Sequence, residues 1–200
     1  MNFVSVDQDI LNFLRVIYFN DISDPFAAAS NRAYRDMNRT IRFDDLSDKK
    51  RESIRQEVTE FLREAISEIV HTANVDQKAY DLWHFLTCSV IRSMYRDMGV
   101  DFYYGQAQKW VNMTIKYLYI VGEFSFEALF PYLHIPIDNY IFQIAKTELG
   151  ISRPPLAWSR WDDYQKQYMT YQEALRSRIK DLDPLRWEFK FWMKAARNLE

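Results

Sequence analysis

The chain has 200 residues, of which 48% are hydrophobic and 16% aromatic, and its formal net charge at pH 7 is -2. This composition excludes an intrinsically disordered chain, and the length suffices for one domain with a sizeable core. The near-neutral charge argues against a protein that coats nucleic acid without specificity, although it leaves room for a local basic face.

The cellular compartment is indicated by cysteine usage and hydropathy. Cys88 is the one cysteine, so no disulfide can form within the chain, which is typical of a reducing compartment. Charged residues interrupt every hydrophobic stretch well before the ~20 residues that a membrane span needs, and no signal peptide is recognisable. We therefore expect a cytoplasmic protein without a membrane partner. No residue pattern predicts a cofactor or a metal, and none indicates an oligomeric state.

Hydrophobic residues recur with helical spacing along most of the chain, and no segment alternates with a period of two. Residues 47–71 carry one hydrophobic stripe, with Ser47 as the expected N-cap. A second long helix is expected over residues 75–98, with Asn74 as its N-cap. Gly99 then lies where a left-handed C-cap would fall.

Proline marks further boundaries. The Asp-Pro pairs at 24–25 and 183–184 are each typical of an N-cap followed by proline at the first helical position. The Pro-Pro pair at 154–155 predicts a rigid loop between a compact block, which ends near Gly150, and a C-terminal pair of helices. The sequence thus predicts a single all-α domain over residues 1–200, with about eight helices.

Two lysines lie within the segment GQAQKWVNMTIKYLY, residues 105–119. Lys109 and Lys116 are 116 − 109 = 7 residues apart, so in a helix they share a face, roughly 10 Å apart. Spacing alone favours a face that meets water. However, a lysine in the first turn after Gly105 is unfavourable near the positive end of the helix dipole. Lys109 is therefore a candidate for a special environment.

The segment HIPIDNYIFQIA, residues 134–145, contains a second candidate. A helix is expected to begin at about Asn139, shortly after Pro136, with Asp138 as its N-cap. Such a role is compatible with catalysis. His134 could act as a base, but a lone histidine beside a proline turn is more often structural.

Together these features resemble the helix-hairpin-helix DNA glycosylase superfamily, most closely its archaeal 8-oxoguanine DNA glycosylase branch. In that superfamily a glycine-containing hairpin leads into a helix with a lysine nucleophile, and an aspartate follows in a Pro-x-Asp context before another helix. Here Gly105 leads to Lys109, and Asp138 follows at a separation of 138 − 109 = 29. Lys116 matches a second lysine of the archaeal branch.

The likeness continues in RWEFKFWMKAARN, residues 186–198. Glu188 and Trp192 match an acidic residue and a tryptophan that line the base pocket in the archaeal branch, although Glu188 is one methylene longer than the usual aspartate. The hairpin has one glycine instead of Gly-x-Gly, and Trp110 replaces the usual threonine. The resemblance covers residues 95–198, about half of the chain.

The resemblance implies two packed lobes with a cleft, residues 25–150 forming one lobe and residues 1–24 with 151–200 the other. It implies a DNA glycosylase with AP lyase activity that excises an oxidised purine such as 8-oxoguanine through a lysine Schiff base. The partner would be DNA that contains a damaged base. The implied site residues are catalytic Lys109 and Asp138, substrate-binding Lys116, Glu188 and Trp192, and DNA-backbone-binding Gly105, Gln106 and Gln108.

Two other interpretations stay open. The first is an inactive protein of the same fold that binds nucleic acid or a protein, which the low net charge and the altered hairpin favour. The second is an unrelated helical interaction module. A basic strip would favour nucleic acid, and its candidates are Arg153, Arg160 and Lys166. An exposed aromatic patch would favour a protein partner, and its candidates are Tyr103, Tyr104, Trp158 and Trp161.

Overall fold

The computed structural model describes the backbone of residues 7–197 and the side chains of residues 7–194, and within them the fold is all-helical, as predicted. The α-helices are α1 (Gln8–Phe19), α2 (Pro25–Met37), α3 (Asp48–His71), α4 (Gln77–Asp97), α5 (Tyr104–Val121), α6 (Asn139–Leu149), α7 (Thr170–Arg178) and α8 (Pro184–Arg197). Short helical turns are η1 (Asn38–Thr40), η2 (Phe130–Tyr132), η3 (Trp158–Arg160) and the π-helical η4 (Tyr164–Met169). Among these described elements, none has the length and hydrophobicity that a membrane crossing requires.

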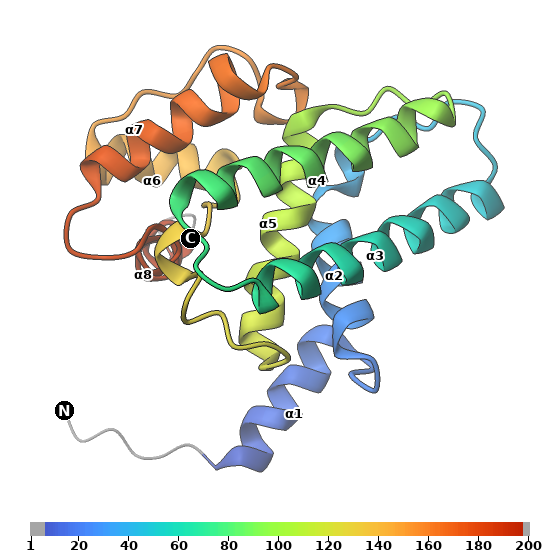
Figure 1. Cartoon of the computed structure of the whole chain (residues 1–200), viewed down its shortest axis with the longest axis horizontal. Helices are drawn as coiled ribbons and strands as arrows, with labels where there is room; N and C mark the ends of the chain where they lie inside the picture. Colours follow the sequence, from blue (N-terminus) through green and yellow to red (C-terminus); the bar gives the residue numbers. More distant parts are fainter. Residues whose placement is uncertain (1–6, 198–200) are drawn as a thin grey trace.

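Helix α5 is the centre of the fold. It runs through the middle of the molecule, with α2 packed along it and α4 crossing it (Figure 1). Every residue from Tyr104 to Leu118 is buried, as expected for a helix that is surrounded on all sides. At one end of the molecule α6, α7 and α8 pack together. The division into two lobes stays a prediction.

Helix boundaries follow the capping residues closely. Asp24 caps α2, and its side chain accepts the Ala27 N–H at 3.0 Å. Helix α3 begins directly after Ser47, as predicted. The predicted start of the next helix was wrong, because Asn74 adopts a left-handed conformation (φ 57°) and Asp76 is the N-cap of α4.

Aromatic residues around the Pro-Pro loop belong to the core. Tyr104, Trp158 and Trp161 are buried, and Tyr103 is partly buried. Trp161 packs against Phe142 of α6 with ring centroids 5.6 Å apart. These side chains therefore do not form the exposed aromatic patch that would favour a protein partner.

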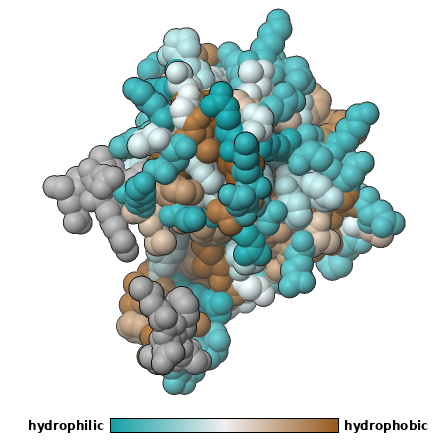
Figure 2. Space-filling model, turned by 90° about the vertical axis from the view of Figure 1, so that its left-hand side faces the viewer, coloured by the Kyte–Doolittle hydropathy of each residue, from teal (hydrophilic) through white to brown (hydrophobic). Residues whose placement is uncertain are grey.

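Helix α1 projects from the body of the molecule (Figure 1). Figure 2 shows hydrophobic atoms on this projecting part. The exposed hydrophobic residues of α1 include Ile10, Phe13, Leu14 and Ile17. At its C-terminal end Phe19 is buried and packs edge-on against Tyr117 of α5.

Candidate functional site

Lys109 of α5 contacts Asp138, the N-cap of α6. The distance from Lys109 Nζ to Asp138 Oδ2 is 2.6 Å, and the two side chains are 6% and 16% exposed. The other carboxylate oxygen, Oδ1, accepts the Ile141 N–H at 2.9 Å. Because the N-cap bond fixes this carboxylate, its second oxygen is held toward the lysine amine.

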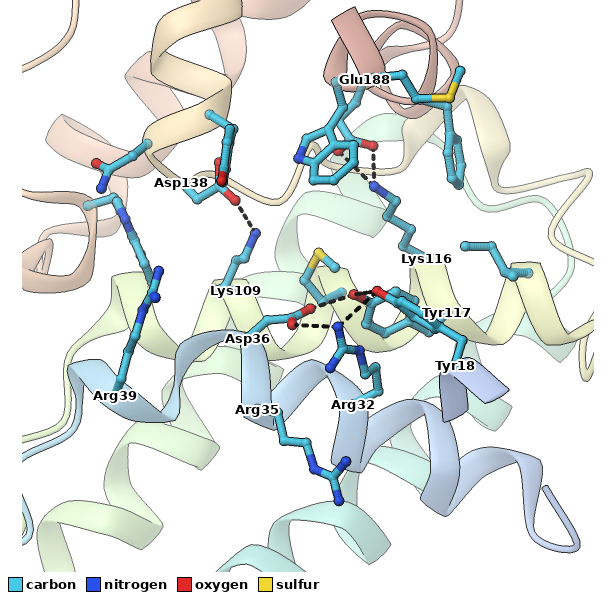
Figure 3. A pocket seen from close by; sticks show the side chains of 18 of the residues that line it. Tyr18, Arg32, Arg35, Asp36, Arg39, Lys109, Lys116, Tyr117, Asp138 and Glu188 are labelled. Carbon is cyan, nitrogen blue, oxygen red and sulfur yellow. Dashed lines mark hydrogen bonds and ion pairs between the residues drawn. The ribbon is translucent and has the colours of Figure 1, made fainter. Parts of the chain in front are cut away.

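A second lysine–carboxylate pair lies two turns further along α5. Lys116 Nζ donates to both oxygens of Glu188 from α8, at 2.8 and 2.7 Å. The ammonium also lies over the Phe189 ring, 4.7 Å from its centroid, and over the Trp192 ring at 5.8 Å. Figure 3 shows both lysines extending from α5 toward their carboxylates.

The water-facing alternative for this helix face is therefore wrong. Lys109 and Lys116 are both buried. The start of α6 and the middle of α8 lie over this face and supply a carboxylate to each lysine. Spacing along α5 could not reveal this, because both partners come from later parts of the chain.

Both pairs line one cavity of about 1140 Å³. Its walls are formed by side chains of α1, α2, η1, α5, α6, η3 and α8 and of the loop before η3. Trp192 borders it, 37% exposed, with its ring 5.7 Å from that of Tyr140. The cavity is somewhat larger than an ordinary small-molecule site of about 300–1,000 Å³. It thus brings together Lys109, Asp138, Lys116, Glu188 and Trp192 of the predicted site.

The predicted DNA-backbone residues lie elsewhere. Gly105 is buried, and its N–H donates to the Trp161 carbonyl at 2.8 Å. Gln106 is also buried, and its amide donates to the Thr40 carbonyl at 2.8 Å. Gln108 is fully buried beside α6. The predicted phosphate contacts of these residues are contradicted, because their polar groups are enclosed and satisfied within the protein.

Two buried glutamines hold the extended segment that precedes Asp138. Gln108 Nε2 donates to the Ile137 carbonyl at 3.0 Å, and its Oε1 accepts the Ile137 N–H at 3.2 Å. Gln172 makes the same pair of bonds with Ile135, at 2.7 and 3.3 Å. Each glutamine amide therefore forms the pair of hydrogen bonds that a residue of a neighbouring β-strand would form. Together the two glutamines fix the path of the chain into α6.

His134 belongs to a buried network and not to the cavity lining. Its Nε2 lies 2.7 Å from Asp81 Oδ1, and its Nδ1 lies 2.8 Å from the Tyr168 hydroxyl. Burial lowers the pKa of His134 to about 4, although the hydrogen bond with Asp81 opposes this shift. Burial also lowers the pKa of His84, which stacks on Tyr168. The surroundings of His134 thus favour a structural role over that of a catalytic base.

A third carboxylate in the cavity was missed by sequence reasoning. Asp36 of α2 accepts a hydrogen bond from the Tyr117 hydroxyl, which lies 3.1 Å from that of Tyr18 (Figure 3). Arg32 donates to Tyr18 at 3.2 Å and lies 3.8 Å from Asp36. Burial, and then the charge of Asp36, raise the pKa of Tyr117 above its usual range. The one signal in the sequence is the i,i+4 spacing of Arg32 and Asp36.

The cavity carries an excess of positive charge. Its cationic lining residues are Arg15, Arg32, Arg35, Arg39, Lys109, Lys116 and Arg153, and its acidic ones are Asp36, Asp138 and Glu188. The formal charge of the lining is 7 − 3 = +4, whereas that of the whole chain is -2. A cavity with this charge concentrates anions.

The site can thus bind an anionic ligand, hold an amine against a carboxylate and stack an aromatic ring. These capacities follow from the residues that line the cavity. Comparison with known proteins finds no matching family model, no similar curated protein and no similar solved structure.

Proposed function

We propose that the protein is a DNA glycosylase with AP lyase activity, which removes an oxidised purine such as 8-oxoguanine through a Schiff base on Lys109. The observation that carries the proposal is the 2.6 Å contact between Lys109 Nζ and Asp138 Oδ2 inside the cavity. These two residues lie 29 positions apart in the sequence, and each matches a glycosylase motif. Their contact is what the proposed reaction requires of its nucleophile and its carboxylate.

The reaction requires an uncharged amine. Asp138, in contact with the Lys109 ammonium, is placed to take up its proton. The amine then attacks C1′ of the sugar, the bond from C1′ to the base breaks, and the base leaves with the bonding electrons and the proton that Asp138 held, which restores the carboxylate. Asp138 stabilises the positive charge that develops on the sugar. Transfer of a proton from the attacking nitrogen to O4′ then breaks the C1′–O4′ bond, and this opening of the sugar ring gives the Schiff base on Lys109.

Strand cleavage follows from the same intermediate. Loss of a proton from C2′ expels the 3′ phosphate by β-elimination, and water then releases Lys109. The base must first leave the duplex stack, which costs a few kcal/mol. Stacking on Trp192, which is partly exposed at the cavity, would offset about 1–3 kcal/mol of this cost. The paired Lys116 and Glu188 offer a donor and an acceptor to the purine edge.

Borohydride trapping on a duplex with a single 8-oxoguanine tests the proposal, because reduction of the Schiff base makes the link between protein and DNA permanent. We expect a covalent product from the wild type and none from Lys109→Gln. Lys78→Gln is the control, since it removes an exposed lysine of α4 that lies outside the cavity lining and leaves Lys109 in place. A wild type that traps neither this duplex nor one with an abasic site would contradict the proposal.

The second candidate function is binding of nucleic acid without cleavage. It is favoured by the pairing of both cavity lysines with carboxylates, an arrangement that also occurs in purely structural ion pairs. This candidate predicts tight DNA binding that is identical for the wild type and Lys109→Gln, with no trapped product from either.

A further inference from the structure

Three arginines at the edge of the cavity make no ion pair or hydrogen bond with another described residue. They are Arg35 of α2, Arg39 of η1 and Arg153 of the loop after α6, here called the rim arginines. All three are exposed. Their charge is therefore available to a partner.

Arginines elsewhere in the described chain are mostly paired. Those in ion pairs outside the cavity are Arg51, Arg55, Arg63, Arg92, Arg96, Arg176 and Arg186. Arg92 and Arg96, for example, share the carboxylate of Asp162 at 2.9 and 2.8 Å. Outside the cavity, Arg42 and Arg160 are the described arginines without an ion pair or a side-chain hydrogen bond, so the unpaired arginines are concentrated at the cavity edge.

Arg32, Arg35 and Arg39 form a row along this edge. Arg32 and Arg35 lie three residues apart on α2, and Arg39 follows four residues later on η1, which continues directly from α2. Seven residues of helix span about 10 Å, at about 1.5 Å per residue. Duplex DNA rises about 3.4 Å per nucleotide along its axis, so the row spans about three nucleotides of that rise.

The row suits a polyanion better than a small anion. In Figure 3 Arg39 lies on the side of Lys109, Arg32 lies beside Asp36, and Arg35 points away from the two lysines. A single phosphate would be held by groups that converge on one point. These guanidinium groups are spread along an edge instead, where successive phosphates of one strand can each meet a cation.

We infer that the rim arginines bind the phosphodiester backbone of the DNA strand whose flipped nucleotide enters the cavity. They would supply the phosphate contacts that the resemblance assigned to residues 105–108, which are buried in the first turn of α5 and cannot present their amides to a phosphate. The inference rests on the proposed function for its ligand, because it assumes that DNA is what the cavity receives.

The test is DNA binding as a function of salt, measured by fluorescence anisotropy with a labelled duplex that contains one 8-oxoguanine. The Arg35→Gln/Arg39→Gln double variant and Arg153→Gln are compared with the full-length Lys109→Gln protein. Lys49→Gln/Lys50→Gln is the matched control, because these two exposed lysines of α3 lie outside the cavity lining. All variants are made in the Lys109→Gln background, so that no reaction takes place during binding.

The double rim variant is expected to bind at least about tenfold more weakly at 0.1 M salt, with a slope of log K against log salt that is smaller by about 2. Arg153→Gln should lower the slope by about 1, and the α3 control should leave it unchanged. Equal losses in the control and rim variants would overturn the inference, as would the absence of DNA binding. Rim-dependent binding by a protein that traps no Schiff base would retain the inference and overturn the proposed glycosylase.

Discussion

The side-chain amide of Gln108 bonds both backbone groups of Ile137. It donates to the Ile137 carbonyl at 3.0 Å and accepts the Ile137 N–H at 3.2 Å. Ile137 immediately precedes Asp138, whose carboxylate contacts Lys109. Gln108 itself immediately precedes Lys109. One buried side chain thus connects the two residues of the proposed reaction through the backbone.

Replacing Gln108 with leucine should therefore lower both stability and activity. The change leaves the Ile137 N–H and carbonyl buried without partners, at about 1–3 kcal/mol for each group. Asp138 would also lose its fixed position, and a misplacement of about 1 Å can cost roughly 100-fold in rate. We expect Gln108→Leu to unfold at lower urea concentration and to trap the 8-oxoguanine duplex at least about tenfold more slowly.

Gln172→Leu is the control for this prediction, because Gln172 makes the same pair of bonds to Ile135, further from Asp138. It should lose a similar amount of stability but retain most of the trapping rate. Equal loss of trapping in both variants would mean that Gln108 acts on stability alone.

The Lys116–Glu188 pair makes a prediction about stability. Glu188 is 2% exposed, and Lys116 is its one ion-pair partner among the described residues. Removing one member of such a buried pair typically costs about 3–5 kcal/mol, because the other is left charged without a partner. Lys116→Met should therefore lower the free energy of unfolding by about this amount.

The double variant Lys116→Met/Glu188→Leu should recover much of that loss, since no unpaired buried charge remains. Urea unfolding of the wild type, both single variants and the double variant measures the coupling. Strictly additive losses would show that the two side chains do not interact in solution.

Gly105 is expected to be required for packing. A Cβ at this position would lie 1.8 Å from the Trp158 carbonyl oxygen, a backbone atom that cannot move without shifting η3. Gly105→Ala should therefore lower the free energy of unfolding by about 3 kcal/mol or more. Gly99→Ala meets no atom within 4 Å and carries only the strain of φ 78°, at about 1–2 kcal/mol. A smaller loss at Gly105 than at Gly99, in thermal or urea unfolding, would refute the packing explanation.

Local signals in the sequence were sufficient to predict many of the helix boundaries. Asp24 and Asp138 are followed by helices at the expected residues, because an N-cap is recognised from its own side chain and the next three residues. The polar residues of α5 were harder to interpret. Asn112 shares the face of the two lysines, for which spacing alone favoured contact with water, but it is buried and donates to the Tyr168 hydroxyl at 2.9 Å.

Long-range pairing limits what could be predicted of the site. The spacing of Lys109 and Asp138 suggested a connection only through resemblance to a family. Nothing local indicated that Tyr117 would bond Asp36, 81 residues earlier, because tertiary packing alone brings α2 to α5. Burial of Gly105 was likewise hidden, since a glycine before a helix is typical of both a phosphate-binding hairpin and a close backbone contact.

The buried histidines predict how stability depends on pH. Burial lowers the pKa of His134 to about 4, and it lowers that of His84 well below the ordinary value of 6.5. At a pH between the lowered pKa of the folded state and the ordinary pKa of about 6.5, each histidine binds a proton in the unfolded chain but not in the folded one. The free energy of unfolding therefore falls as pH decreases through this range. For His134 the window runs from about 6.5 to 4, and a shift of this size corresponds to about 3 kcal/mol.

Acidic groups extend the loss to lower pH. Although burial opposes it, hydrogen bonds from His134 and then Arg176 hold the pKa of Asp81 well below its usual range. The stability that this carboxylate contributes is present above the unfolded pKa of about 3.9 and is lost as pH falls further. Urea unfolding at pH 7.5, 6, 5 and 4 should thus give a free energy of unfolding that decreases throughout. His134→Gln should reduce the slope between pH 6 and 5, and a slope equal to that of the wild type would show that His134 is charged in the folded protein.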